Sequence, residues 1–179
     1  MKHKLITVLF SLLFLGCNTQ NTSDSSFDPE LRLKELGIVL PETSSPVANY
    51  VNTVVSGNLL YVSGKGPLKS DGTYIEGKVG KDLTPEEVYQ AARLTGINLI
   101  ATIKSAIGDL RKVKRIIRVT GMVNAVPEFS EHPKVINGCS DLLVQVFGER
   151  GRHTRAAVGM GSLPSNIAVE IDLILELED

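Results

Sequence analysis

An arginine and a glutamate stand out near the carboxyl end, in a stretch otherwise rich in small and apolar residues, GRHTRAAVGMGSLPSNIAVEIDLIL (residues 151–175). Alternation with a period of two puts Glu170 on the strand face opposite the apolar residues. The intervening Pro164 indicates a loop, so the flanking strands are expected to pair antiparallel and bring Arg155 near Glu170. Such a pair suits a small carboxylated ligand, because a guanidinium grips a carboxylate through two parallel hydrogen bonds.

The same two side chains have a plainer interpretation. An Arg and a Glu on paired strands often form a structural ion pair, or are both simply solvated. The geometry expected from the sequence does not separate these alternatives. A glutamate shielded from water is also the usual way in which a carboxyl group exchanges protons near neutrality. The functional hypothesis is therefore binding of a carboxylate with acid–base chemistry beside it.

Two runs carry a family resemblance, HTRAAVGMGSLPSNIAVEI (residues 153–171) and YVNTVVSGNLLYVSGKGP (residues 50–67). They resemble the Rid family of reactive-intermediate deaminases, also called YjgF-like and often labelled endoribonuclease L-PSP. The resemblance covers roughly residues 47–177. The segment HPKVINGCSDLLVQVFGERGRHTRAAVG (residues 132–159) is most similar to a divergent branch of that family.

The resemblance implies roles for particular residues. Arg155 matches the family's carboxylate-binding arginine, and Glu170 matches the glutamate proposed to orient water and deliver a proton. The other matching positions are the cleft tyrosine, the end of a strand beside the ligand, and a helix asparagine; here they are Tyr50, Ser63, Gly64 and Asn137. Tyr50 could equally be a core or interface aromatic, and Asn137 could equally make a local helix hydrogen bond.

Two neighbours of the arginine bear on mechanism. Some family members carry cysteine two residues after the arginine, but Ala157 stands there in this chain, which excludes thiol chemistry at that position. His153 precedes the arginine by two residues and titrates in the physiological range. We expect it to be an ordinary polar loop histidine.

The amino terminus has the pattern of a signal peptide, residues 1–16, with basic residues followed by an apolar run. Cys17 follows directly and is the expected lipidation site; secretion without lipid is the alternative. Residues 17–30 are rich in Ser, Thr and Asn and are expected to form a flexible tether, with the Rid-like domain at residues 31–179. The chain is thus expected to be exported and lipid-anchored in the bacterial envelope, in the periplasm or at the outer membrane.

The composition of the chain limits the kinds of partner and ligand that are expected. Removal of residues 1–16 lowers the count of Lys and Arg from 19 to 17 against 20 acidic residues, a net charge of −3. This balance argues against nucleic acid as a partner. With Cys17 assigned to lipid, Cys139 has no disulfide partner and is expected to be buried in a helix. The three histidines lack metal-ligand spacing, so no metal and no cofactor are expected.

The element pattern predicts an α+β fold with strands, a helix, a strand, a second helix and two final strands. A capping box at Thr84 predicts a helix to about residue 107, and Pro133 leads into a helix over residues 135–147. Strands are expected at residues 59–63, 73–77, 114–126, 155–161 and 167–177. One mixed sheet with two helices on a single face follows.

Beside the arginine, Ala157, Gly159 and Gly161 form a small-residue surface that is expected to approach another sheet. The resemblance implies how: the family has a chorismate-mutase-like fold and forms homotrimers around a central barrel, with ligand clefts between subunits.

Three functions compete at this point. The first is hydrolysis of reactive enamines or imines in an inter-subunit cleft, with Arg155 holding the substrate carboxylate. The alternative is an envelope-anchored protein that binds a small carboxylate, similar to a 2-keto acid, without turnover. An endoribonuclease is the least favoured, because the domain is acidic and lacks a catalytic histidine pair.

Overall fold

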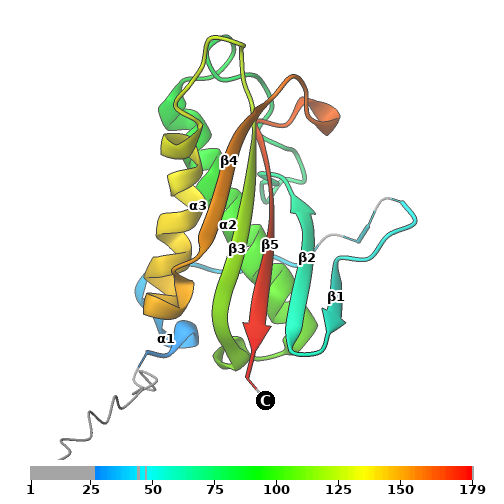
Figure 1. Cartoon of the computed structure of the whole chain (residues 1–179), viewed down its shortest axis with the longest axis vertical. Coiled ribbons are helices and arrows are strands. Elements are labelled where there is room, and N and C mark those ends of the chain that lie inside the picture. The colour runs from blue at the N-terminus through cyan, green and yellow to red at the C-terminus, as the bar shows by residue number, and fades with distance from the viewer. Residues whose placement is uncertain (1–26, 44, 47, 179) are drawn as a thin grey trace, which may run out of the picture.

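The computed structural model describes residues 27–43, 45–46 and 48–178 (Figure 1). The helices and strands are α1 (Pro29–Glu35), β1 (Thr53–Ser56), β2 (Leu59–Lys65), α2 (Pro85–Ile107), β3 (Val113–Asn124), α3 (His132–Phe147), β4 (Thr154–Met160) and β5 (Val169–Leu177). Short 3-10 turns lie at η1 (Leu110–Lys112), η2 (Gly148–Gly151) and η3 (Pro164–Asn166).

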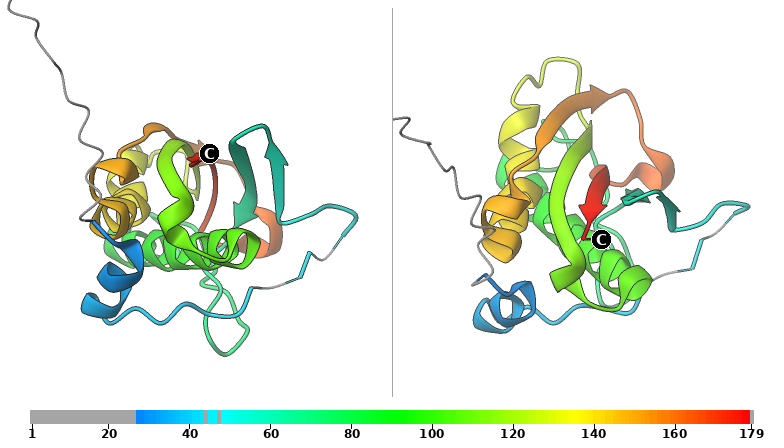
Figure 2. Two further views of the ribbon diagram at one scale, coloured as in Figure 1. Left: turned by 90° about the horizontal axis from the view of Figure 1, so that it is seen from below. Right: turned by 60° about the horizontal axis from the view of Figure 1, so that its bottom comes forward.

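The five strands form one mixed sheet in the order β1-β2-β5-β3-β4. Neighbours are antiparallel except β3 and β4, which are parallel. The two long helices α2 and α3 cover one face of this sheet (Figure 2). This arrangement is an α+β sandwich of the chorismate-mutase-like type, which confirms the predicted fold class.

Helix α2 begins where the sequence predicts. The Thr84 hydroxyl accepts a hydrogen bond from the Glu87 backbone amide, and the Glu87 carboxylate accepts one from the Thr84 amide, which completes the capping box. Gly108 ends the helix with a φ of 77°, a backbone conformation that favours glycine. These local signals fix the direction of the longest helix.

Helix α3 packs apolar side chains into the core. It begins at His132, earlier than the predicted start at residue 135, and its buried residues include Val135, Cys139, Leu142, Leu143 and Val146. Burial raises the pKa of the Cys139 thiol to about 12. Cys139 is therefore a packing residue rather than a nucleophile.

The predicted pairing of the last two strands is wrong. Strand β3 lies between β4 and β5, parallel to β4 and antiparallel to β5. A parallel β3–β4 pair is the usual result when a helix, here α3, connects two strands. The loop from residue 161 to 168 is long enough to step across one strand, since strands are about 4.8 Å apart.

The strand faces depart from simple alternation at two places. Register shifts in β3 against β5 lie between residues 113 and 115 and between 116 and 118. Ile116 is therefore buried, while the next residue, Ile117, is only partly buried. The segment 73–77 is also not a strand, because it makes only the isolated bridges Leu68 to Tyr74 and Glu76 to Ile167.

The small residues of β4 do not form an open surface. Ala157 packs against the core, and a side chain at Gly159 would lie 2.3 Å from the His132 ring. These positions allow α3 to approach the strand closely. The predicted contact of this surface with another sheet is therefore wrong for Ala157 and Gly159, which face a helix of the same chain.

A short helix precedes the sandwich. The Asp28 carboxylate caps α1, which includes Pro29 and Glu30, the last two residues of the predicted tether. Arg150 donates a hydrogen bond of 2.6 Å to the Phe27 carbonyl, and Glu30 forms an ion pair with Lys104. The predicted signal peptide, Cys17 and the rest of the tether lie outside the described residues. Within the described ranges, no helix has the length and apolar character needed to cross a bilayer.

Candidate functional site

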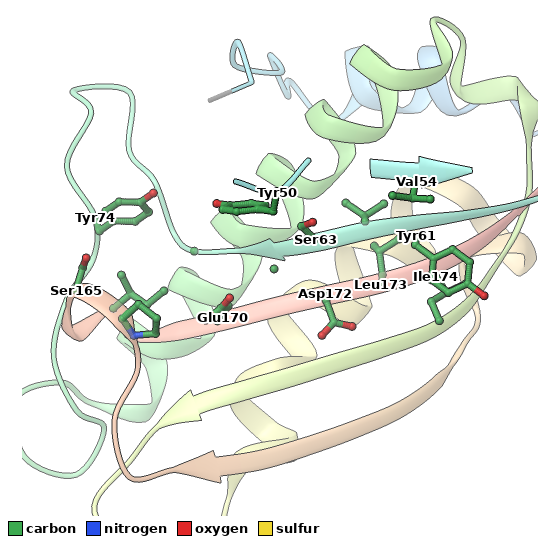
Figure 3. A pocket seen from close by; sticks show the side chains of 15 residues that line it. Tyr50, Val54, Tyr61, Ser63, Tyr74, Ser165, Glu170, Asp172, Leu173 and Ile174 are labelled. Carbon is green, nitrogen blue, oxygen red and sulfur yellow. The ribbon is translucent and has the colours of Figure 1, made fainter. Parts of the chain in front are cut away.

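A hollow of about 800 Å³ opens on the sheet face that the helices leave uncovered (Figure 3). Tyr50, Ser63, Gly64 and Glu170, four of the predicted site residues, line it. The strand β2 supplies Ser63 and Gly64, and β5 supplies Glu170. The hollow therefore gathers residues that are more than 100 positions apart in the sequence.

Gly64 lets the Glu170 carboxylate lie directly against the backbone of β2. A Cβ atom added at Gly64 would stand 2.2 Å from Oε1 of Glu170. A break in the β2–β5 register between Val62 and Lys65 lies at this point. A side chain here would displace the carboxylate, so the position of the Glu170 carboxylate depends on this glycine.

Glu170 is half-buried, and its environment favours the neutral acid. Burial, with a smaller effect of the neighbouring Asp172, raises the pKa of the Glu170 carboxyl above its ordinary value of 4.5. Within the part of the chain that the structure describes, no side chain donates a hydrogen bond or forms an ion pair with this carboxylate. A carboxyl group with a raised pKa is suited to give and take a proton in acid–base chemistry.

Ser63 supports the edge of the hollow. Its hydroxyl donates a hydrogen bond of 2.7 Å to the carbonyl of Val51, the residue after Tyr50. Tyr50 itself is exposed, with 48% of its surface accessible, and Tyr61 and Tyr74 add further aromatic rings to the lining. Figure 3 shows the Tyr50 and Tyr74 rings near the end of the hollow where Glu170 lies.

Arg155 and Asn137 form a second cluster, against α3. Nη1 of Arg155 donates to Oδ1 of Asn137 at 2.8 Å and to Oγ of Ser140 at 3.0 Å. Asn137 and Ser140 are three residues apart on α3, so both face the same neighbouring strand. The guanidinium is therefore anchored through one of its three nitrogens.

His153 completes this cluster. Its Nδ1 lies 2.7 Å from the Gly151 carbonyl oxygen, and its Nε2 lies 3.0 Å from Oγ of Ser140. Burial, opposed by the hydrogen bond to Gly151 and assisted by the charge of Arg155, lowers the pKa of His153 below its ordinary value of 6.5. His153 lies in the loop before β4, as expected, and its ring is in addition part of a hydrogen-bonded chain that ends at Arg155.

The two clusters lie on opposite faces of the sheet. Arg155 pairs with the buried Val119 and so faces the helices, whereas Glu170 pairs with Met122, three residues further along β3. The register is continuous between these positions, and an odd spacing reverses the face. One chain therefore does not bring Arg155 and Glu170 together.

Sequence reasoning missed several contributors. Tyr61, Tyr74 and Asp172 line the hollow, and Ser140 joins the arginine cluster. The spacing in the sequence could have indicated two of them. Asp172 follows Glu170 by two residues and so shares its strand face, and Ser140 follows Asn137 by three residues and so shares its helix face. No group of three or more metal-ligating side chains occurs among the described residues.

Comparison with known proteins agrees with this architecture. Residues 30–177 match the family model described as "YjgF/chorismate mutase-like, putative endoribonuclease". The chain belongs to this YjgF/Rid-like family. The matched region includes both clusters.

Several relatives span almost the whole domain. Protein TCP17 of Trypanosoma cruzi is 43% identical over 82% of this chain and 92% of its own length. The protein Atu1372 of Agrobacterium tumefaciens, of unknown function, is 51% identical with a TM-score of 0.78, covering 84% of this chain and 92% of that one. TdcF of Escherichia coli with bound serine is 20% identical with a TM-score of 0.57, covering 76% and 94%. The last likeness shows the fold alone.

Proposed function

We propose that this protein is a homo-oligomeric Rid-like hydrolase that deaminates small enamine or imine acids in a cleft between two copies of the chain. Arg155 of one copy would hold the substrate carboxylate, and Glu170 of another would serve as the acid–base group. The observation that carries the proposal is the arrangement of the Arg155 guanidinium, which is held at one nitrogen only.

The two hydrogens on Nη1 of Arg155 match the two bonds to Asn137 and Ser140. Nε and Nη2 have no partner among the described residues, and their N–H groups point the same way along one edge of the guanidinium. This edge fits the two oxygens of a carboxylate side by side. Arg155 is exposed on the edge strand β4, so a ligand can reach it.

A second copy is needed because the two clusters lie on opposite faces. The sheet face without helices exposes apolar side chains from three strands, Val54, Tyr61 and Val158. An uncovered apolar sheet face of this kind is typical of association between subunits. A copy whose β4 edge approaches the hollow of its neighbour would carry Arg155 toward Glu170. The family resemblance favours a trimer.

The chemistry follows from these two groups. With the carboxylate on Arg155, the C=N carbon would lie toward the hollow. Water adds to that carbon, one proton goes to the nitrogen, and the carbon–nitrogen bond of the resulting carbinolamine breaks to give a keto acid and ammonia. Glu170 would accept a proton from the water and return it to the leaving nitrogen, a role that its raised pKa suits.

The test is release of ammonia and keto acid from imino acids generated in situ by an amino-acid oxidase. Wild type should accelerate hydrolysis, whereas Arg155→Ala and Glu170→Gln should both fall close to the uncatalysed rate. Equal rates for the three proteins would reject the hydrolase proposal.

Carboxylate binding without turnover is the second candidate. It is favoured by the fact that the Arg155 cluster is complete within one chain, whereas Glu170 depends on a partner to meet the ligand. Binding of 2-ketobutyrate by wild type and Glu170→Gln, with loss in Arg155→Ala and no wild-type turnover, would support it.

We also propose that the domain is exported and anchored in the bacterial envelope through lipid on Cys17, as a divergent branch of the family. The support is the signal-peptide pattern of residues 1–16 followed directly by cysteine. Mass spectrometry of the purified full-length product should find acyl groups on an amino-terminal Cys17, and Cys17→Ser should remove them. An intact, unmodified amino terminus would contradict this proposal.

A further inference from the structure

We infer that Ser140 and His153 are positioning residues for Arg155, linked in a hydrogen-bonded relay that runs from the Gly151 carbonyl to the guanidinium. The inference rests on the proposed carboxylate-binding role of Arg155 and extends it to two residues that do not touch the ligand. It is carried by four contacts between 2.7 and 3.0 Å, whose directions follow from the chemistry of the groups.

The first contact sets the tautomer of the histidine. The Gly151 oxygen is a carbonyl and can only accept, so Nδ1 of His153, 2.7 Å away, must carry a hydrogen. In the neutral ring Nε2 is then a bare acceptor. Partial burial of the ring favours this neutral state.

The second contact sets the hydroxyl of Ser140. Its oxygen lies 3.0 Å from Nε2, and the only hydrogen available between these two atoms is that of the hydroxyl. Ser140 therefore donates to His153 and turns its lone pairs away from the ring. Arg155 has no acceptor, so its Nη1 can use one of those lone pairs directly.

The consequence is a fixed guanidinium plane. One Nη1 hydrogen is held by Asn137 and the other by Ser140, whose own orientation is held by His153. Two bonds to one nitrogen define the direction of the planar group, and with it the direction of the Nε and Nη2 edge that is left for a carboxylate. Without His153 the Ser140 hydroxyl can rotate and place its hydrogen toward Arg155, where it repels the donor.

Binding measurements test the relay. Calorimetry with 2-ketobutyrate is compared for wild type, Ser140→Ala, His153→Phe and the double variant. Each single change should weaken binding roughly tenfold, the loss typical of one hydrogen bond to a charged group. The double variant should be no weaker than Ser140→Ala, because His153 acts through Ser140.

His153→Gln is the conservative variant. Its amide oxygen can accept from Ser140, so it should regain most of the affinity that His153→Phe loses. Arg152→Ala removes an exposed arginine that pairs with Glu149 and with no other side chain of the described residues, and it should bind as wild type does. Effects of Ser140 and His153 that add in the double variant would overturn the relay, since they would then act independently.

A ligand-free measurement keeps the inference separate from the proposed function. Nitrogen-15 NMR of the full chain, assigned by the signal missing in His153→Gln, should find the ring hydrogen on Nδ1. A hydrogen on Nε2 would overturn the relay. If Arg155→Ala binds as wild type does, carboxylate binding by Arg155 fails; if only that variant loses binding and the Ser140 and His153 variants do not, the relay alone fails.

Discussion

The arginine cluster and the open-face hollow are organised in opposite ways. In the cluster, each polar side chain has a hydrogen-bond partner, from Gly151 through His153 and Ser140 to Arg155. In the hollow, the Glu170 carboxylate occupies the space that the missing side chain of Gly64 leaves open, and it receives no hydrogen bond from the described residues. The first cluster is held by hydrogen bonds within the chain, and the second leaves its carboxylate without such a partner among the described residues.

This difference fits the proposal that a single chain carries halves of two different sites. Arg155 needs rigidity, because recognition of a planar carboxylate depends on the direction of the guanidinium. Glu170 needs a raised pKa, and hydrogen bonds to its charged form would lower it. Under the proposed function, each cluster has the property that its role requires, and association of copies would supply the missing partner.

The largest expected effect is the loss of 2-ketobutyrate binding when Arg155 is replaced. Arg155→Ala should weaken 2-ketobutyrate binding by more than about 100-fold, because two charge-assisted hydrogen bonds are lost, each worth about 1.5–3 kcal/mol. Arg155→Lys should recover little of this loss, since an ammonium cannot make the paired contact. Calorimetry gives the affinities, with Arg152→Ala as the matched control. Equal binding by Arg155→Ala and Arg152→Ala would contradict the account.

A smaller effect is expected on the hollow side. Gly64→Ala should reduce turnover at least about tenfold while leaving 2-ketobutyrate binding within about twofold, because the new Cβ must displace the Glu170 carboxylate. The fold should tolerate it, since the displaced atom is the far end of a flexible side chain. Gly161→Ala, where an added Cβ meets no atom within 4 Å, is the control. Loss of binding together with turnover would mean that the halves are not separable.

The smallest effect is on stability against pH. The raised pKa of Glu170 means that the folded chain holds this proton more tightly than the unfolded chain. Its contribution to the free energy of unfolding is therefore fully present below about pH 4.5, the ordinary value, and is lost as pH rises through the folded pKa. Glu170→Gln should lack this loss. Its free energy of unfolding, measured by urea denaturation, should therefore rise relative to that of wild type between pH 4 and pH 7.5.

Glu176, on the same strand, provides the opposite control. Its pKa is lowered, first by the hydrogen bond from Lys114, so its contribution appears as pH rises and is lost as pH falls through the folded pKa. The free energy of unfolding of Glu176→Gln should therefore fall relative to that of wild type as pH rises over the same range. The same pH trend in both variants would refute the assignment of distinct environments.

Local signals made much of the fold predictable. The capping box at Thr84 and the apolar spacing of α3 depend on neighbours in sequence, and both helices lie where these signals indicate. The order of strands is set by non-local pairing, so the insertion of β3 between β4 and β5 could not be read from the loop at Pro164. The register shifts of β3 against β5, which place Ile116 on the core face, also depend on non-local pairing and could not be read from the sequence.

The candidate site was predictable by residue but not by arrangement. Four of the six predicted residues share the hollow and two share the arginine cluster. Sequence alternation gives the face of a residue within its own strand, but it does not give the face of one strand relative to another. The relay through Ser140 and His153 depends on a helix meeting a strand, which no spacing in the sequence encodes.

The central claim is that a complete site needs Arg155 from one copy and Glu170 from another. Arg155→Ala and Glu170→Gln chains, each expected to be inactive alone, can be mixed in equal amounts, unfolded and refolded together, and assayed for imine hydrolysis. Random assembly into a closed oligomer should restore about a quarter of wild-type turnover, because a quarter of the interfaces then pair an intact arginine with an intact glutamate. No recovery of turnover in refolded mixed oligomers, with refolded wild type active, would contradict the account.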